Sequence, residues 1–306
     1  MIEKTIGYNF KKSVSLLKNN LDIKSPELDI LILFEYILKI PKNKIFVQFE
    51  NTLSEKNIYL LKKYVLMRYL NYPIAYIINI KDFYGRSFFV DNSVLIPRPE
   101  SEFLVEITKY IVNKLQDLPL DDFKYSFLDV DLGILNKSLE SLNNTFYKSK
   151  NINILDIGTG SGNIGTTLAL ELPKVHVDLV DISPKALKIA KMNVKKFTTE
   201  IGVIKSNLLS NVHSNYHIFV ANLPYIPLSL QIDKSIYHEP FSALFSDQDG
   251  VYFYNKLVKD INKLKDKPLY LIIEKIPACD LTLAKIVSNF NLKPLFLSQF
   301  VNVYGF

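Results

Sequence analysis

The chain has 306 residues, which is long for one small domain and fits two of unequal size. Hydrophobic residues make up 48% of it, so an intrinsically disordered protein is excluded. The net charge of +6 and the pI near 9.0 weakly favour acidic or nucleic-acid-bearing partners. A lysine-rich composition spread over all surfaces explains the same charge.

Cysteine usage and apolar patterning indicate the compartment. The one cysteine, Cys279, has no partner for an internal disulfide. Residues 1–20 mix charged with apolar side chains, unlike a signal peptide or a membrane span. We therefore expect a soluble, cytoplasmic protein that does not associate with membranes.

The first part of the chain has the pattern of a helical bundle. Apolar side chains recur at helical spacing in residues 6–20, 25–40 and 54–70. Ser25 as N-cap and Pro26 in the first turn mark the start of the second helix. We predict a helical domain over residues 1–73, with substrate recognition as its role.

The pattern changes after Pro73. Residues 74–80 and 86–96 are rich in β-branched and aromatic side chains, and turn residues lie between them. We predict a β-hairpin linker over residues 74–97. A helix then begins near Glu100, and the polar segment 117–150 is interpreted as an insertion of unknown role.

Residues 151–275 alternate between strand and helix patterns. Short apolar runs, typical of strands buried on both faces, occupy residues 151–158, 174–182, 201–207, 216–222 and 268–275. Helical patterns separate them, so we predict an α/β domain with a mostly parallel sheet. Ligands of such sheets bind at the carboxyl ends of the strands.

A glycine-rich loop follows the first of these runs, in "ILDIGTGSGNIG". It contains Gly158, Thr159, Gly160, Ser161 and Gly162 between a strand and a helix. Glycines there allow a ligand to approach the backbone closely, and the helix N-terminus offers free N–H groups.

An acid follows the loop about twenty residues later. Asp181 ends the second strand, where a carboxylate can accept both hydroxyls of a ribose. The two features together predict an adenosine-containing cofactor, rather than a glycine turn without a ligand. Asn207 and Leu208 follow the third strand, where an amide can pair with an adenine edge, although an ordinary asparagine turn fits equally well.

The loop also satisfies the dinucleotide fingerprint, so NAD is an alternative cofactor. Asp156, which precedes the glycines, favours S-adenosylmethionine, as does the lack of residues suited to hydride transfer. Asp156 is expected either to orient the loop or to meet the cofactor's ammonium group through water.

The fourth strand ends in "NLPY". A conjugated amide or amine nitrogen is a poor nucleophile, so an enzyme that methylates it should accept its N–H hydrogens and direct the lone pair at the methyl group. The Asn222 side chain and a nearby backbone carbonyl can be the two acceptors. Pro224 would stiffen the loop, and Tyr225 would pack over the planar substrate group.

Six stretches in this order resemble the HemK/PrmC family of release-factor glutamine methyltransferases. They are "PIAYIINIKDFYG", "VLIPRPESE", "ILDIGTGSGNIG", "VDISPKALKIAKMN", "NLPYI" and "HEPFSAL". The resemblance implies a Rossmann-like, seven-stranded class I S-adenosylmethionine-dependent methyltransferase domain over residues 98–306, after the helical domain and the hairpin linker.

The family's activity is N5-methylation of the glutamine in the Gly-Gly-Gln motif of class-I peptide chain release factors. By carry-over, the cofactor contacts are the glycine loop from Gly158 to Gly162, Asp181, and the Asn207–Leu208 turn, with Asn222 adjoining. Asn222 and the carbonyl of Leu223 would hold the glutamine amide. The resemblance further implies that Arg98, Glu100 and Glu239 wall the site or meet the protein substrate.

Three positions depart from the family pattern. Leu223 stands where the family usually has proline, Asn207 where it typically has aspartate, and "EKIP" replaces the usual glutamate followed by a glycine-containing sequence. Leu223 keeps the carbonyl but frees the backbone φ angle, and Asn207 keeps an acceptor but loses the charge.

Two other functions remain open. "NLPY" also occurs in ribosomal RNA adenine N6-methyltransferases, although those carry their second domain after the catalytic one, and we find no basic-aromatic stripe for RNA. A degenerate domain that binds cofactor as a scaffold is the other. His213 and His217 lack a third ligand, so we expect no metal site. We also expect a monomer without a nucleic-acid substrate.

Overall fold

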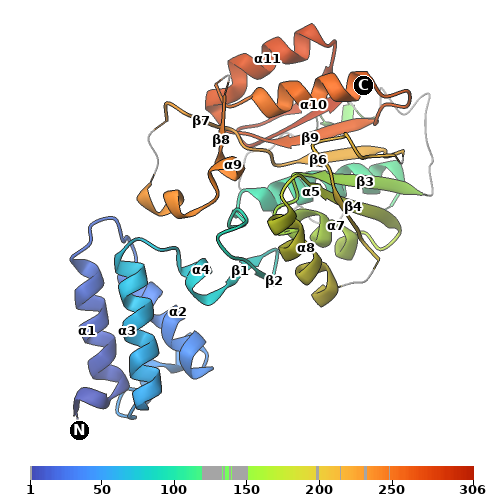
Figure 1. Cartoon of the computed structure of the whole chain (residues 1–306). Coiled ribbons are helices and arrows are strands. Elements are labelled where there is room, and N and C mark those ends of the chain that lie inside the picture. Colours follow the sequence, from blue (N-terminus) through green and yellow to red (C-terminus); the bar gives the residue numbers. More distant parts are fainter. Residues whose placement is uncertain are drawn as a thin grey trace. The chain divides into compact units, whose positions relative to one another are not determined.

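Figure 1 shows the computed structural model, which describes residues 2–118, 133, 135–137, 139, 151–197, 200–213, 215–230, 233–247 and 249–306. The predicted insertion over residues 117–150 lies mostly outside the described residues. The chain divides into two compact units, which are residues 1–80 with 231–239, and residues 81–230 with 240–306. None of the helices in the described ranges is long and apolar enough to cross a membrane.

The first unit is a bundle of helices. Its α-helices are α1 (Ile6–Lys18), α2 (Pro26–Leu38), α3 (Glu55–Tyr69) and α4 (Ile74–Ile78), and its short 3-10 helices are Ile2–Lys4, Lys42–Lys44, Phe46–Gln48 and Lys234–His238. Leu17, Leu33 and Phe34 are fully buried between α1, α2 and α3. The three predicted helices are confirmed, but the Ser25 side chain forms no capping hydrogen bond.

The prediction of a strand over residues 74–80 was wrong for most of that stretch. Residues Ile74–Ile78 form α4, which begins after Pro73, and Asn79 ends it in the left-handed conformation with φ 57°. The helical turn buries Tyr76 and Ile77 on one side. Burial of these two side chains outweighs the preference of β-branched residues for strands.

A distant segment of the chain completes the first unit. Residues 233–239, which lie more than 150 positions after α4 begins in the sequence, group with the N-terminal helices. The Lys234 ammonium lies 3.0 Å from Asp22 Oδ2, and the His238 ring lies 4.7 Å from the ring of Tyr72. His238 Nε2 also lies 3.2 Å from the Leu70 carbonyl oxygen. No periodicity in the sequence indicates this long-range packing.

Replacing Arg68 by alanine should destabilise the first unit by about 3 kcal/mol. The Arg68 guanidinium lies 2.6 Å from Asp29, both side chains are largely buried, and burial raises the pKa of the Asp29 carboxyl. Without Arg68, that carboxyl is left unpaired. Urea denaturation, with hydrogen exchange in α2 and α3 as the probe, measures the loss in the free energy of unfolding.

Lys18→Ala is the matched control, because the Lys18–Glu27 pair has a similar separation of 2.6 Å but is more than half exposed. Exposed pairs contribute little to stability. Equal losses in the two variants would contradict the role of burial.

The second unit contains a mixed seven-stranded sheet with the strand order β10-β11-β9-β6-β3-β4-β5. The parallel strands are β3 (Ile152–Ile157), β4 (Val175–Asp181), β5 (Gly202–Lys205), β6 (Ile218–Ala221) and β9 (Tyr270–Glu274). They match the five predicted runs. β10 (Lys293–Leu297) and β11 (Val301–Gly305) pair antiparallel, with β11 next to β9.

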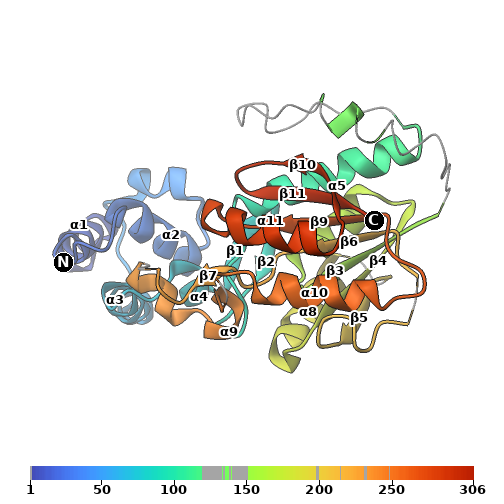
Figure 2. The same ribbon diagram turned by 90° about the horizontal axis from the view of Figure 1, so that it is seen from above.

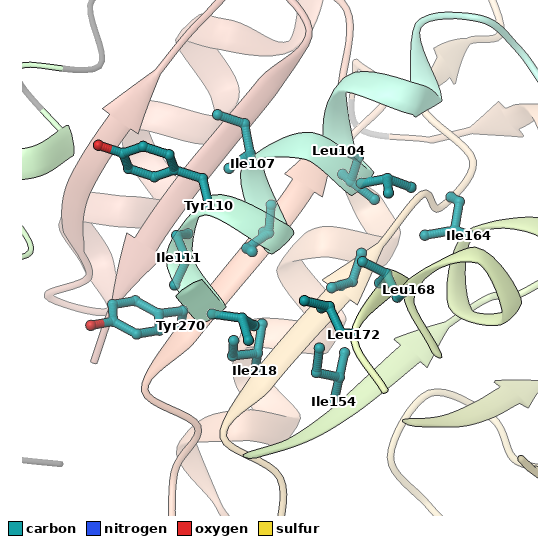
Figure 3. Packing of buried hydrophobic residues seen from close by; sticks show 14 of the residues in the cluster. Leu104, Ile107, Tyr110, Ile111, Ile154, Ile164, Leu168, Leu172, Ile218 and Tyr270 are labelled. Carbon is teal, nitrogen blue, oxygen red and sulfur yellow. The ribbon is translucent and has the colours of Figure 1, made fainter. Parts of the chain in front are cut away.

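Helices cover both faces of this sheet. One face packs against α5 (Ser101–Leu115), α7 (Asn163–Glu171) and α8 (Pro184–Phe197), and the other against α10 (Tyr252–Asn262) and α11 (Asp280–Asn289) (Figure 1 and Figure 2). Successive residues of β3 alternate between the faces: Ile154 lies beside Leu172 in the core that also contains Leu104 and Leu168 (Figure 3). Its neighbour Leu155 belongs to the opposite core. Burial on both faces explains the continuous apolar runs in the sequence.

Short elements border the cofactor end of the sheet. They are the hairpin β1 (Ile80–Phe83) and β2 (Arg86–Phe89), the pair β7 (Ile226–Pro227) and β8 (Phe245–Ser246), α9 (Phe241–Leu244) and the 3-10 helix Pro277–Cys279. Asn193 of α8 is fully buried and bonds to both backbone groups of Phe89 and to the Ser161 carbonyl. This side chain therefore ties the hairpin to the glycine loop.

Candidate active site

A cavity of about 510 Å³ opens at the carboxyl ends of β3, β4, β5 and β6. Of the residues predicted for the site, those in its wall are Gly158, Thr159, Gly160, Ser161, Asp181, Asn207, Leu208, Asn222, Leu223, Pro224 and Arg98. The structure thus gathers most of them, because these strands run parallel and end at one edge.

The glycine loop lines the cavity with main-chain atoms at Gly158 and Gly160, which have no side chains. Gly158 and Gly160 have φ angles of 73° and 56°, which other residues rarely adopt. A Cβ atom added at Gly158 would lie 2.7 Å from Leu223 Cδ2, whereas one added at Gly160 would meet no atom within 4 Å. Gly158 thus permits contact with the "NLPY" loop, and Gly160 exposes backbone to the cavity.

Asp156 holds this loop from beneath. Its Oδ2 accepts hydrogen bonds from Thr159 Oγ1 at 2.6 Å and from the Gly165 N–H at 2.9 Å. The carboxyl is fully buried, which raises its pKa to about 6, and it is not part of the cavity wall. These contacts favour the loop-orienting role over a contact to the cofactor's ammonium group.

Asp181 lies in the cavity wall at the end of β4. Its Oδ2 accepts from the Gly160 N–H at 2.9 Å, and its Oδ1 accepts from the Ser183 N–H at 2.8 Å. Burial raises the pKa of the carboxyl, and these backbone donors oppose that rise. Each carboxylate oxygen has a further lone pair, so the fixed carboxylate can also accept from a vicinal diol.

Asn207 and Leu208 form part of the wall after β5. The Asn207 side chain is exposed, and its Oδ1 accepts from Lys256 Nζ at 3.2 Å. Leu208 is buried with a φ angle of 52°. Phe253 of α10 lines the same cavity, and no sequence pattern indicated it. Leu208 and Phe253 provide apolar surface for a planar ring.

Asn222 follows β6 and faces the cavity. Its Nδ2 donates to Ser101 Oγ at 3.0 Å, and its Oδ1 accepts no hydrogen bond from the described residues. The next residue, Leu223, donates its N–H to the Tyr254 hydroxyl at 3.2 Å. That hydroxyl donates to the Glu274 carbonyl and also lies 3.5 Å from the Leu223 carbonyl oxygen. Because a carbonyl oxygen has two lone pairs, the Leu223 carbonyl can still accept a further hydrogen bond.

Tyr225 adopts a different position from the one expected. Its hydroxyl donates to Glu274 Oε1 at 2.8 Å, and its side chain is not part of the cavity wall. Packing over a planar substrate therefore stays a prediction. Glu100 is exposed and outside the wall, and Glu239 belongs to the first unit.

The histidine and cysteine side chains considered for other chemistries have surroundings that suit a structural role. No group of three His, Cys, Asp or Glu side chains suited to a metal occurs among the residues that the structure describes. His217 Nδ1 accepts from the Asn153 N–H at 3.0 Å, and burial lowers its pKa. Burial raises the pKa of the Cys279 thiol, which disfavours a reactive thiolate.

Known proteins resemble both parts of the chain. Residues 10–78 match the family described as PrmC N-terminal domain, and residues 131–243 match Methyltransferase small domain. The release factor glutamine methyltransferase of Bacillus subtilis is 30% identical over 80% of this chain and 76% of that protein. That of Buchnera aphidicola subsp. Schizaphis graminum is 31% identical, over 88% and 85%. The chain belongs to the release factor glutamine methyltransferase family.

A longer relative also matches. The "Bifunctional methyltransferase" of Rickettsia typhi is 33% identical over 84% of this chain, but the match takes up 48% of that protein. The chain thus spans about half the length of such curated relatives. Membership of the release factor glutamine methyltransferase family confirms the resemblance drawn from the six sequence motifs.

The cavity fits the cofactor of S-adenosylmethionine-dependent methyltransferases. Asp181 lies in the wall, where its carboxylate could accept from ribose hydroxyls, and the backbone at Gly160 leaves open space where a side chain would project. Leu208 and Phe253 supply apolar surface for the adenine. The donor set, the bare loop and the volume thus agree with the prediction of this cofactor.

Sequence reasoning missed three side chains behind the "NLPY" loop. Ser101 begins α5, Tyr254 lies on α10, and Glu274 ends β9, and all three are almost fully buried. Glu274 had a signal in the sequence, since it is the first residue of "EKIP", where the release factor glutamine methyltransferase pattern also has glutamate. Residues 92–95 and Pro97 also line the cavity, which extends the site to the segment after the hairpin.

Proposed function

We propose that this protein transfers a methyl group from S-adenosylmethionine to the side-chain nitrogen of the glutamine in the Gly-Gly-Gln motif of class-I peptide chain release factors. The observation that carries the proposal is Asn222, which lines the cavity together with the glycine loop and whose Nδ2 donates to Ser101, so that Oδ1 is left to accept from a substrate. Family membership supports this substrate over adenine in ribosomal RNA.

The reaction needs little beyond orientation. The bound cofactor supplies an electrophilic methyl group on a sulfonium, which leaves as a thioether. Asn222 Oδ1 and the Leu223 carbonyl accept the two N–H hydrogens of the glutamine amide. The nitrogen lone pair then points along the line of attack, and one proton leaves to solvent after the N–C bond forms.

We propose the helical domain, residues 1–73, as the part that recognises the release factor, with residues 74–97 as the linker to the catalytic domain. Exposed apolar side chains in the first unit suit a protein partner: Leu21, Phe46, Val47, Tyr59, Leu66 and Leu70. Arg98, Glu100 and Glu239 are proposed as further substrate contacts. The protein is expected to act as a cytoplasmic monomer.

The direct test is incubation with methyl-labelled S-adenosylmethionine and an unmodified class-I release factor. We expect one methyl group on the glutamine of the motif, identified by peptide mass mapping. A release factor with asparagine at that position is the control and should stay unlabelled. Label on ribosomal RNA, with none on the release factor, would refute the proposal in favour of the adenine alternative.

A further inference from the structure

Glu274 lies directly beside Asn222 at the end of the sheet. Strands β6 and β9 are parallel neighbours with Ala221 opposite Ile273, so the next residues along the two strands are Asn222 and Glu274. The Glu274 side chain is 1% exposed, and it is not part of the cavity wall. A carboxyl group thus lies buried behind the residue proposed to hold the substrate amide.

The contacts of this carboxyl involve the "NLPY" loop. Tyr225 donates to Oε1 at 2.8 Å, while Oε2 is buried and accepts no hydrogen bond from the described residues. Burial raises the pKa of Glu274, and Ser101, Tyr225 and Asn222 oppose that rise as neighbouring hydrogen-bond donors. The adjacent Lys275 does not neutralise it, since Lys275 Nζ pairs with Asp280 at 2.5 Å.

The chemistry of these groups fixes the direction of the hydrogen bonds. An ionised carboxylate can only accept, and a serine hydroxyl has one hydrogen to donate. When Ser101 gives that hydrogen to Glu274, its oxygen must accept from Asn222. Only Nδ2 of Asn222 can donate, in agreement with the 3.0 Å contact, so Oδ1 is not held by Ser101.

We propose that Glu274 is a positioning residue, which acts through Ser101 to keep Asn222 Oδ1, and not Nδ2, directed at the substrate amide. This inference rests on the proposed function, because it explains how the acceptor is oriented. An asparagine with the opposite orientation would present a donor to the substrate N–H and would repel it. Through Tyr225, the same carboxylate also fixes the other end of the loop.

The test compares Glu274→Gln with the wild type in the release factor assay. The glutamine amide can donate to Ser101, so the Asn222 orientation is no longer imposed. We expect kcat to fall roughly tenfold or more, as for loss of a charge-assisted hydrogen bond. The Kd for S-adenosylhomocysteine should stay unchanged, because Glu274 does not line the cavity.

Ser101→Ala tests the same chain of contacts without touching the carboxyl. It should reduce kcat similarly, and the double variant should lose no more than either single one, because both act on one orientation. Asp178→Asn is the control, since Asp178 is another buried carboxyl, bonded to Tyr216 and the Gly202 N–H outside the cavity wall. It should leave kcat unchanged per folded molecule.

A pH profile separates positioning from a structural role. Burial raises the pKa of Glu274 to about 6, so wild-type kcat should fall as the pH drops through that value. The titratable groups that act on Glu274 are Glu100, Tyr225 and Tyr254. Asp156 has a pKa of about 6 as well, so the decisive result is the profile of Glu274→Gln, which should lack this limb.

Several outcomes would overturn the inference while the proposed function stands. In each of them the wild type is active. Either Glu274→Gln and Ser101→Ala both keep full kcat, or the losses in the double variant are additive, or the fall of kcat at low pH persists in Glu274→Gln. A wild type that methylates no glutamine would instead refute the proposed function. If Glu274→Gln does not fold, Ser101→Ala alone decides.

Discussion

Replacing Asn222 by alanine should lower kcat for glutamine methylation by about 10²- to 10³-fold, as for loss of a preorganised hydrogen-bonding group that acts on the transition state. Asn222 Oδ1 is the proposed side-chain acceptor at the end of β6, and the alanine variant keeps the Leu223 carbonyl as the other proposed acceptor. Single-turnover rates with saturating cofactor and release factor measure the effect.

Cofactor binding should change little in this variant, because the glycine loop and Asp181 keep their contacts. Asn222→Asp is the matched control for shape. Its carboxylate can accept from the substrate but has no hydrogen to donate to Ser101 Oγ. The kcat of Asn222→Asp should therefore be higher than that of Asn222→Ala and well below that of the wild type. Near-normal turnover of Asn222→Ala would show that the asparagine is not the acceptor.

The ends of the strands that form the site were predictable, because strands buried on both faces appear in the sequence as continuous apolar runs. The run "YHIFVAN" stops at Asn222, and "LVDIS" stops at Asp181, since polar side chains begin where the sheet reaches its ligand edge. The carboxyl ends of parallel strands lie at the same edge of a sheet. The proximity of these residues could therefore be predicted without knowledge of the strand order.

The support behind the site was not predictable in the same way. Glu274 adjoins Asn222 only because β9 is the neighbour of β6. Asn193 links the hairpin to the glycine loop, and its contact with Phe89 joins residues more than a hundred positions apart in the sequence. Such contacts depend on strand order and tertiary packing, which leave no local pattern. The helix at Ile74–Ile78 was missed for the same reason.

The departure at Leu223 has a structural counterpart. A proline there has no N–H, whereas Leu223 donates its N–H to the fully buried Tyr254 hydroxyl. Its Cδ2 also occupies the space that a Cβ at Gly158 would need. In this chain a hydrogen bond and side-chain packing thus constrain the loop at the position where a proline ring would restrict φ.

Asp181→Asn should raise the Kd for S-adenosylhomocysteine on the order of a hundredfold. Both carboxylate oxygens of Asp181 accept from backbone N–H groups, at Gly160 and Ser183. An asparagine has one acceptor oxygen, so its NH₂ group must face one of these donors. The glycine loop or the start of α8 is then displaced, and the charge that favours the ribose hydroxyls is lost.

Isothermal titration calorimetry measures this loss, and Asp178→Asn on the same strand is its control, because Asp178 is buried outside the cavity wall. The pH dependence gives a second check. Burial raises the pKa of Asp181, so wild-type affinity should start to fall at a higher pH than for an ordinary aspartate, and Asp181→Asn should lack this fall. Tight binding by Asp181→Asn would mean that the loop, without the acid, holds the cofactor.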